Sequence, residues 1–158
     1  MKPSNSKFIK SQKGRLKSFV SVQSTKVFSG PVFGDFSLFS CENGFLIDKH
    51  VEIGKKVLKS FLGKKGLLWV IVFPNKSITK KPVGVRMGKG KGGVSNWVTP
   101  VYAGSSVFEI KNVSHAIASK AFQLVQKKLP LQTQWCARVK PLKSLYLLLI
   151  YVETFLFG

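Results

Sequence analysis

The sequence predicts an α+β fold in which two helices and several mostly antiparallel strands form a sandwich. Two segments place apolar residues three to four positions apart, which indicates amphipathic helices. Between and around them lie short runs rich in β-branched and aromatic residues, bounded by glycine and proline, which indicate strands. A length of 158 residues fits one such domain with a modest core. An enzyme with a cleft between two domains is disfavoured.

The first predicted helix covers residues 48–62. Its apolar positions recur on one face, namely Val51, Val57, Leu58, Phe61 and Leu62. Asp48 is the expected N-cap, and Gly63 or Gly66 should lie just past the end.

The second predicted helix covers residues 114–129. Ser114 can cap its start, Lys127 and Lys128 would favour its C-terminal dipole, and Pro130 would stop it. The expected buried face consists of Ile117, Ala121, Leu124, Val125 and Leu129.

Strands are expected on both sides of these helices. Residues 27–39 should form short strands broken by turns, and residues 67–73 a buried strand with Trp69 in the core. Residues 95–102 and 106–110 should be two strands joined across Ala103 and Gly104, and residues 131–139 a closing strand.

Charge is the strongest functional signal. The chain has 26 Lys plus Arg against 6 Asp plus Glu, a formal net charge of +20, so the compact state repels itself unless a polyanion is bound. Nucleic acid supplies such charge, and basic groups on its phosphates release condensed counterions. An anionic membrane surface would satisfy the same charge. The 44% of hydrophobic residues argue against a purely disordered basic tail.

The two ends of the chain differ from the predicted domain at 26–140. Residues 1–25 form a basic arm whose cations are spaced about three apart, at Lys7, Lys10, Lys13, Arg15 and Lys17. Residues 141–158 form an apolar extension that is shorter than the roughly 20 residues a membrane-spanning helix needs. Docking on another protein is expected for it, with interfacial membrane attachment as the alternative.

The stretch 80–93 (KKPVGVRMGKGKGG) combines five glycines with five basic residues. Glycine lets the backbone approach a ligand closely, and the interleaved cations attract phosphate. Gly88, Gly90 and Gly93 match the dinucleotide pattern GxGxxG, with Glu109 at a suitable distance, but that site requires a helix directly afterwards. Residues 94–101 look extended, which disfavours a nucleotide cofactor.

The sequence contains no recognisable pattern of a catalytic or metal site. The acidic residues are scattered, neither His50 nor His115 has an evident Ser or Cys partner, and Cys41 and Cys136 lie in no metal-binding pattern. We therefore expect no enzyme activity, metal, cofactor or small-molecule substrate.

Several strings, taken in order, carry a family resemblance: SKFIKSQKGR, LLWVIVFPNKSITKKPVGVRMGKGKG, SNWVTPVYAG followed by FEI, and KAFQLVQKKLP. Across residues 7–139 the chain resembles the bacterial and organellar large-subunit ribosomal protein L sixteen family. The resemblance implies an α+β sandwich among ribosomal RNA (rRNA) helices, and makes a removable presequence within the basic first 30 residues less expected. It also implies a loop near the peptidyl-transferase region and the aminoacyl-site tRNA.

The implied contacts fall into two sets. The rRNA-binding residues would be Lys7, Lys10, Lys13, Arg15, Lys17, Lys55, Lys56, Lys59, Lys80 and Lys81. The loop near tRNA would contain Arg86, Met87, Gly88, Lys89, Gly90, Lys91 and Gly92, and in some bacteria of this family the arginine is a modification site.

The chain departs from the family pattern at three places. Cys41 to Gly44 replaces a basic Gly-Arg-rich turn, Lys55 and Lys56 lie in a helix that is normally arginine-rich, and the tail extends past the usual end. Only three arginines occur, a skew that an AT-rich organellar genome would produce. We expect a mitochondrial ribosome, with the plastid as alternative, and neighbouring ribosomal proteins as partners of the tail through Leu145, Leu147, Leu149 and Tyr151.

Overall fold

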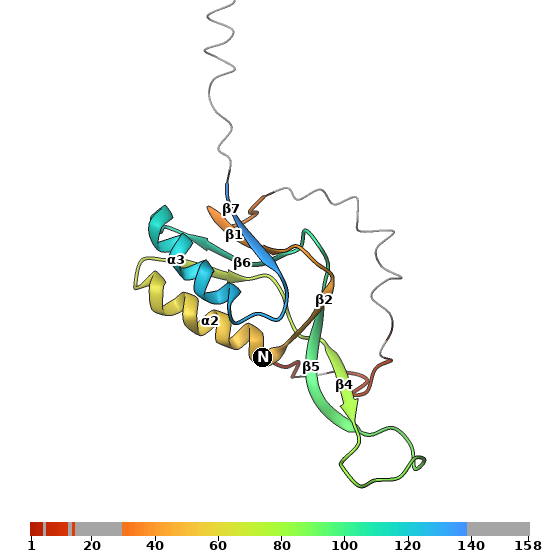
Figure 1. The fold of residues 1–158 in the computed structure, drawn as a ribbon. Coiled ribbons are helices and arrows are strands. Elements are labelled where there is room, and N and C mark those ends of the chain that lie inside the picture. The colour runs from red at the N-terminus through yellow and green to blue at the C-terminus, as the bar shows by residue number, and fades with distance from the viewer. Residues whose placement is uncertain (5, 13, 15–29, 139–158) are drawn as a thin grey trace, which may run out of the picture.

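A computed structural model describes residues 1–4, 6–12, 14 and 30–138 (Figure 1). Within these residues the α+β prediction is confirmed, with two helices and two antiparallel sheets. The elements follow the order β1 (Phe36–Ser40), β2 (Gly44–Ile47), α2 (Asp48–Leu62), β3 (Leu67–Val70), β4 (Lys76–Lys80), β5 (Gly93–Val101), β6 (Ser106–Lys111), α3 (His115–Gln126) and β7 (Thr133–Ala137). The expected apolar segment 141–158 lies outside the described residues.

The strands divide into a four-stranded sheet of order β3-β6-β1-β7 and a three-stranded sheet of order β2-β5-β4. The expected turn at Ala103 and Gly104 does join two strands, but β5 and β6 belong to different sheets, so the turn carries the chain between them. Gly104 has a φ of +81° and its N–H donates to the Ser40 carbonyl at 2.8 Å, which fixes this crossing point.

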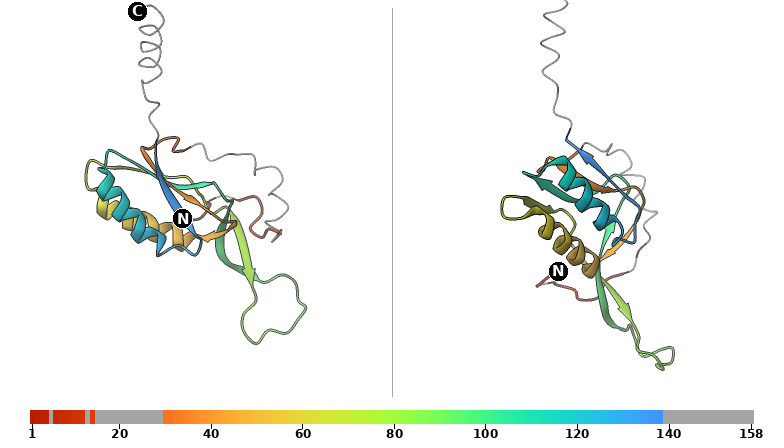
Figure 2. Two further views of the ribbon diagram at one scale, coloured as in Figure 1. Left: turned by 45° about the horizontal axis from the view of Figure 1, so that its top comes forward. Right: turned by 60° about the vertical axis from the view of Figure 1, so that its left-hand side comes forward.

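The core forms where α2 and α3 pack side by side on the four-stranded sheet (Figure 2). Phe108 and Ile110 from β6 and Leu38 from β1 are fully buried there. The helices contribute Val51, Leu58, Ala118, Ala121, Phe122 and Val125, all at most 1% exposed. Burial of this apolar area drives folding, and it takes place away from the β4–β5 hairpin.

Gly54 sets the approach of α2 to the core. A Cβ at this position would lie 2.7 Å from Phe108 Cζ and 2.8 Å from Phe108 Cε2. The ring therefore occupies the space that a side chain would need. Glycine weakens a helix interior, so its presence here is explained by packing.

The ends of α2 match the sequence expectation only in part. The helix covers the predicted residues 48–62 and is followed by Gly63, which has a φ of +60°. Asp48, however, is not the N-cap: Ile47 takes that position with extended backbone angles, and no side chain caps the helix. The Asp48 carboxylate instead accepts the N–H of Lys49 at 2.9 Å, because it already lies in the first turn.

For α3, the predicted length and buried face are both partly wrong. Ser114 is at the N-cap but forms no side-chain cap bond, and the helix ends at Gln126, before Lys127 and Lys128. The chain tightens there into bonds between residues three apart, Lys128 N–H to the Val125 carbonyl and Leu129 N–H to the Gln126 carbonyl. Phe122 packs against Trp135 at 6.3 Å between ring centroids. Burial of that ring leaves Ile117 and Leu124 42% and 41% exposed.

The expected buried strand at residues 67–73 is wrong in length and position. β3 stops at Val70 and lies at the edge of its sheet, so it has a partner on one side only. Leu67, Ile71 and Phe73 are exposed, and Trp69 is half-buried, stacked on Phe33 at 6.3 Å between ring centroids. The closing strand is confirmed as the shorter β7. Of residues 27–39, the structure describes 30–39, which form one strand, β1, from Phe36 onward, preceded by bends rather than by a further strand.

We predict that Gly54→Ala destabilises the protein. In an open helix position alanine would stabilise by about 1 kcal/mol. Here its methyl group would collide with the Phe108 ring, and overpacking should lower the free energy of unfolding by about 1–2 kcal/mol. Urea denaturation measures this change. As a control, Ser60→Ala on the exposed side of the same helix should change the free energy of unfolding by less than about 0.5 kcal/mol. Higher stability of Gly54→Ala would contradict the packing argument.

Candidate nucleic-acid interface

The glycine-rich stretch forms the tip of a hairpin that protrudes from the body of the protein (Figure 1). β4 and β5 pair antiparallel from Lys76 with Val98 to Lys80 with Gly93, and residues 81–92 connect them. The far half of β5 pairs with β2, from Val98 with Ile47 to Val101 with Gly44. One long strand thus belongs to both the hairpin and the body, which gives the loop a firm base.

The loop uses its glycines for left-handed backbone conformations. Gly84, Gly88 and Gly90 have φ values of +87°, +100° and +78°, a region that residues with a Cβ rarely adopt. Lys89, between two of them, also has a positive φ of +52°. The Lys81 ammonium donates to the Gly88 carbonyl at 2.5 Å and ties the two sides of the loop together.

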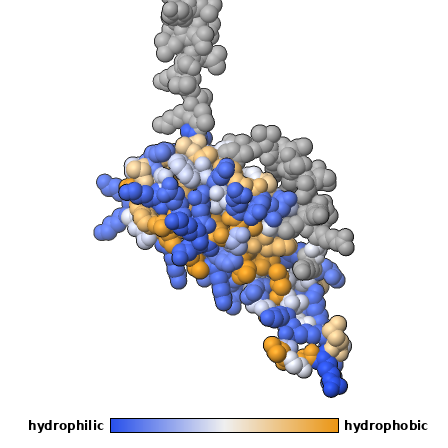
Figure 3. Space-filling model, viewed as in Figure 1, coloured by the Kyte–Doolittle hydropathy of each residue, from blue (hydrophilic) through white to orange (hydrophobic). Residues whose placement is uncertain are grey.

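Basic and apolar side chains alternate on the exposed tip (Figure 3). Arg86, Lys89 and Lys91 are exposed, and Val83 and Met87 are 98% and 96% exposed. The sequence contains no acidic residue between positions 53 and 108, so the hairpin carries no internal counter-charge. Such a surface can bind phosphates with its cations and pack apolar groups against sugars and bases.

The base of the loop is hollowed on one side. A hollow of about 390 Å³ is lined by Lys80, Lys81, Pro82, Val83, Gly93, Val94 and Ser95. Lys80 and Lys81, both predicted rRNA-binding residues, therefore lie at one rim of the protruding loop.

The N-terminal arm lies beside this hairpin (Figure 1). The Ser11 N–H donates to the Ser77 hydroxyl at 3.2 Å, and the Ser11 hydroxyl donates to the Ser77 carbonyl at 3.1 Å. Lys10 and Lys91 are joined by two further bonds, in which the Lys10 ammonium donates to the Lys91 carbonyl and the Lys91 ammonium to the Ser11 carbonyl, each at 2.8 Å. The predicted arm and the predicted loop thus form one surface.

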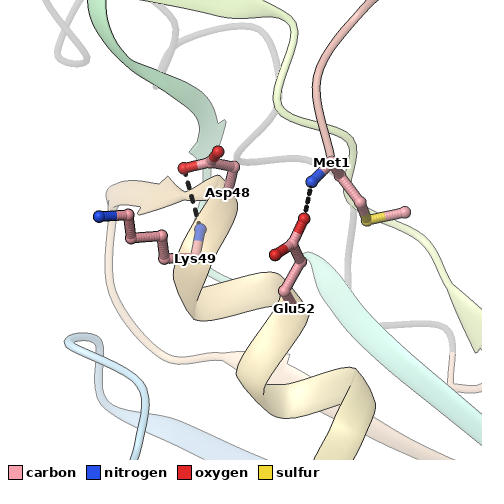
Figure 4. A network of polar contacts seen from close by, with 4 residues as sticks. All are labelled: Met1, Asp48, Lys49 and Glu52. Atoms are coloured by element: carbon pink, nitrogen blue, oxygen red, sulfur yellow. Dashed lines mark hydrogen bonds and ion pairs between the residues drawn. The ribbon is translucent and has the colours of Figure 1, made fainter.

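The start of the arm is fixed separately. The Met1 amino group pairs with the Glu52 carboxylate on α2 (Figure 4). That amino group, followed by Lys56 and Lys55, holds the pKa of the Glu52 carboxyl below its ordinary value. Lys7 is exposed, with its ammonium 5.7 Å from the centre of the Phe8 ring. The predicted residues Lys13, Arg15 and Lys17 lie outside the described part of the chain.

The remaining predicted cations form a second basic surface. Lys56 and Lys59 are exposed on α2 and Lys55 is half-buried there. In both Figures 1 and 2 this helix lies away from the hairpin tip, so the structure does not gather all predicted residues at one place.

Glu109 has a structural position rather than the ribose-binding one that the dinucleotide pattern would need. Its carboxylate is fully buried and accepts N–H bonds from Val32 at 3.2 Å, Phe33 at 2.7 Å and Gly34 at 2.9 Å. The glycines are followed by β5, as the extended pattern predicted, and not by a helix. Within the described residues no three His, Cys, Asp or Glu side chains form a metal-binding group.

No helix in the described part of the chain combines the length and apolarity needed to cross a membrane.

The sequence of this chain is similar to those of known proteins. The family model described as Ribosomal protein L16p/L10e matches residues 3–136, which include the arm, both helices and the hairpin. The chain belongs to this family. It is 43% identical over 135 residues to the large ribosomal subunit protein uL16 of Carsonella ruddii (strain PV), covering 85% of this chain and 96% of that protein.

Two further relatives have similar coverage. The uL16 protein of Wigglesworthia glossinidia brevipalpis is 40% identical over 133 residues, 84% of this chain and 93% of that protein. The large ribosomal subunit protein uL16c of Oltmannsiellopsis viridis is 36% identical over 138 residues, 87% of this chain and 99% of that protein. The family resemblance expected from the sequence is therefore confirmed.

Adjacent glycines at the base of the loop should respond differently to alanine. A Cβ on Gly92 would lie 2.6 Å from the Lys80 carbonyl oxygen, whereas one on Gly93 would meet nothing within 4 Å. We predict that Gly92→Ala opens the base of the hairpin and speeds hydrogen exchange of the β4 and β5 amides about tenfold or more, which a local loss of roughly 1.4 kcal/mol would cause. Gly93→Ala is the matched control, and equal effects of the two would contradict the geometry.

Proposed function

We propose that this chain is a structural constituent of the large ribosomal subunit, where it binds rRNA and helps to position aminoacyl-site tRNA near the peptidyl-transferase region. The family match over residues 3–136 carries this proposal, because it includes both the basic arm and the hairpin. The relatives are themselves named as large ribosomal subunit proteins.

The charge distribution supports rRNA as the main partner. The arm and the base of the loop present lysines in segments that contain no acidic residue, and α2 presents the exposed Lys56 and Lys59. Lysine contacts phosphate as a point charge without reading base sequence, which suits binding to a folded RNA through its backbone. The proposed rRNA contacts are Lys7, Lys10, Lys13, Arg15, Lys17, Lys55, Lys56, Lys59, Lys80 and Lys81.

The geometry of the hairpin supports a role for its tip with tRNA. A loop that protrudes from a firmly paired base can reach a second RNA while the body stays bound to the first. Arg86 and Lys89 are exposed at the tip, and the neighbouring glycines allow close approach of the backbone to a phosphate. The proposed contribution is positioning, in keeping with a family of ribosomal structural proteins, and involves no chemical step.

We also propose a cellular location for the protein and a binding partner for its C-terminal tail. The scarcity of arginine and the abundance of lysine and phenylalanine support a mitochondrial ribosome. The similarity to the chloroplast protein uL16c of Oltmannsiellopsis viridis supports the plastid alternative. The apolar residues Leu145, Leu147, Leu149 and Tyr151 would contact a neighbouring ribosomal protein, and they lie outside the described residues.

We predict that the protein sediments with the large ribosomal subunit at moderate salt. We also predict that more of the protein is found in purified mitochondria than in purified plastids. Gradient sedimentation followed by immunodetection measures both. Residues 144–158 are not needed for this association, so a chain that ends at Lys143 should still sediment with the subunit. Recovery of the full chain in the membrane fraction, lost on truncation, would instead indicate a peripheral membrane protein.

At the loop, Arg86→Ala and Lys89→Ala should impair tRNA accommodation more than subunit assembly. Loss of one tip cation removes a phosphate contact of about 1–2 kcal/mol, or roughly a tenfold slower accommodation. Pre-steady-state aminoacyl-tRNA binding to purified variant ribosomes measures this step, with Lys120→Ala on the exposed side of α3 as control. Equal loss of assembly and accommodation would indicate that the loop is only a structural clamp.

A further inference from the structure

Two lysines that are 81 positions apart in sequence meet where the arm crosses the hairpin. The Lys10 ammonium bonds to the carbonyl of Lys91, and the Lys91 ammonium bonds to the carbonyl of Ser11, the residue after Lys10. We call this reciprocal pair the lysine clasp. Each lysine thus holds its charge against the backbone of the other segment, so two positive charges lie at one junction.

The surroundings add to this charge. Gly14 of the arm lies near Lys76 of β4, whose ammonium is 3.1 Å from the point that a Gly14 Cβ would occupy. The same ammonium lies 5.9 Å from the centre of the Phe45 ring. The sequence has no acidic residue in positions 1–34 or 53–108, so neither segment provides a carboxylate for the clasp.

The clasp is therefore held together by hydrogen bonds and opposed by electrostatic repulsion. Its position is fixed from one side by Ser11, which bonds to Ser77, and Ser77 is buried in β4. An ammonium has three N–H donors, and the bond to a carbonyl uses one of them. Within the described residues the other donors of Lys10 and Lys91 are free to bind an anion from solution. An oxyanion with several oxygens can bridge both.

An RNA phosphodiester fits this junction better than a carboxylate of another protein. Phe8 and Ile9 precede the clasp on the arm and are 74% and 64% exposed, so a ligand here meets apolar surface on one side and cations on the other. A nucleotide presents that combination, with a charged phosphate beside an apolar sugar and base faces.

We propose that the lysine clasp is a single phosphate site for the RNA backbone, shared by the arm and the loop. Occupancy by one phosphate removes the repulsion between Lys10 and Lys91 and locks the arm against the hairpin, which orients the loop. This inference rests on the proposed rRNA-binding function. It adds to that function one particular site in which two segments act together.

A double-mutant cycle on the full chain tests the shared site. Lys10→Gln, Lys91→Gln and the double variant are titrated with a large-subunit rRNA fragment over a range of salt concentrations. A glutamine amide can still donate to a carbonyl, so these variants remove charge and retain a donor. The double variant Lys49→Gln with Lys120→Gln removes two exposed helix charges and is the matched control.

If both lysines hold one phosphate, either single variant should lose about tenfold in affinity, and the double variant should lose little more. The slope of log affinity against log salt should fall by about 0.7–0.9 in all three, since one phosphate contact is lost. Losses that multiply in the double variant, or an unchanged slope, would overturn the proposal. The control pair should leave the slope unchanged.

Two further readouts separate the remaining explanations. RNA binding should slow hydrogen exchange of the loop amides in the wild type and in the control pair, and should do so far less in the clasp variants. Clasp variants that lose binding to anionic phospholipid vesicles but keep full RNA affinity would assign the site to a membrane and overturn the proposal. If the wild type fails to bind the rRNA fragment at all, the proposed function itself fails, an outcome distinct from failure of the shared site alone.

Discussion

The uncompensated positive charge of the arm and the hairpin is the constraint on which the rest of this structure depends. Three carboxylates of the described residues bind groups of the chain itself: Glu109 is buried among backbone N–H groups, the exposed Glu42 accepts the N–H of Gln132, and the exposed Glu52 binds the Met1 amino group. None is available to the lysines at the protruding hairpin. Hydrogen bonds hold the arm against the hairpin, and a partner with dense negative charge would relieve the repulsion between their lysines.

This constraint explains why the molecule has two parts with different tasks. The core around Phe108 and Phe122 is made by β1, β6 and the two helices, and it needs no partner to bury its apolar area. The hairpin adds little to that core and extends β5 beyond it. Stability and binding are thus carried by different residues, which lets the loop keep exposed apolar and basic groups that a core could not tolerate.

The sequence was sufficient for features that depend on local periodicity and backbone chemistry. The bounds of α2 were predicted because its apolar spacing and Gly63 both act within a few residues. The strand after the glycines was predicted from Trp97, Val98, Thr99 and Pro100. The buried face of α3 was not, because the contact of Phe122 with Trp135 turns the helix, and this contact depends on tertiary packing. β3 was predicted as buried because a short apolar run does not reveal whether its strand lies at a sheet edge.

The candidate interface was predicted as two separate pieces. Basic spacing indicated the arm and the glycine pattern indicated the loop, but the contact of Lys10 with Lys91 joins residues too distant for any sequence pattern. The sequence likewise gives no reason to expect different roles for Gly92 and Gly93, but only Gly92 lies close to the Lys80 carbonyl. Ser77 carried no signal at all, and its role appears only where Ser11 bonds to it.

A density map of the assembled large ribosomal subunit containing this chain tests the central claim most directly. The account predicts that the arm and the β4–β5 hairpin lie together against rRNA, with a backbone phosphate between Lys10 and Lys91 and with Arg86 directed toward the aminoacyl-site tRNA. A hairpin that points into solvent, or an arm that is separated from it and bound elsewhere, would contradict the account.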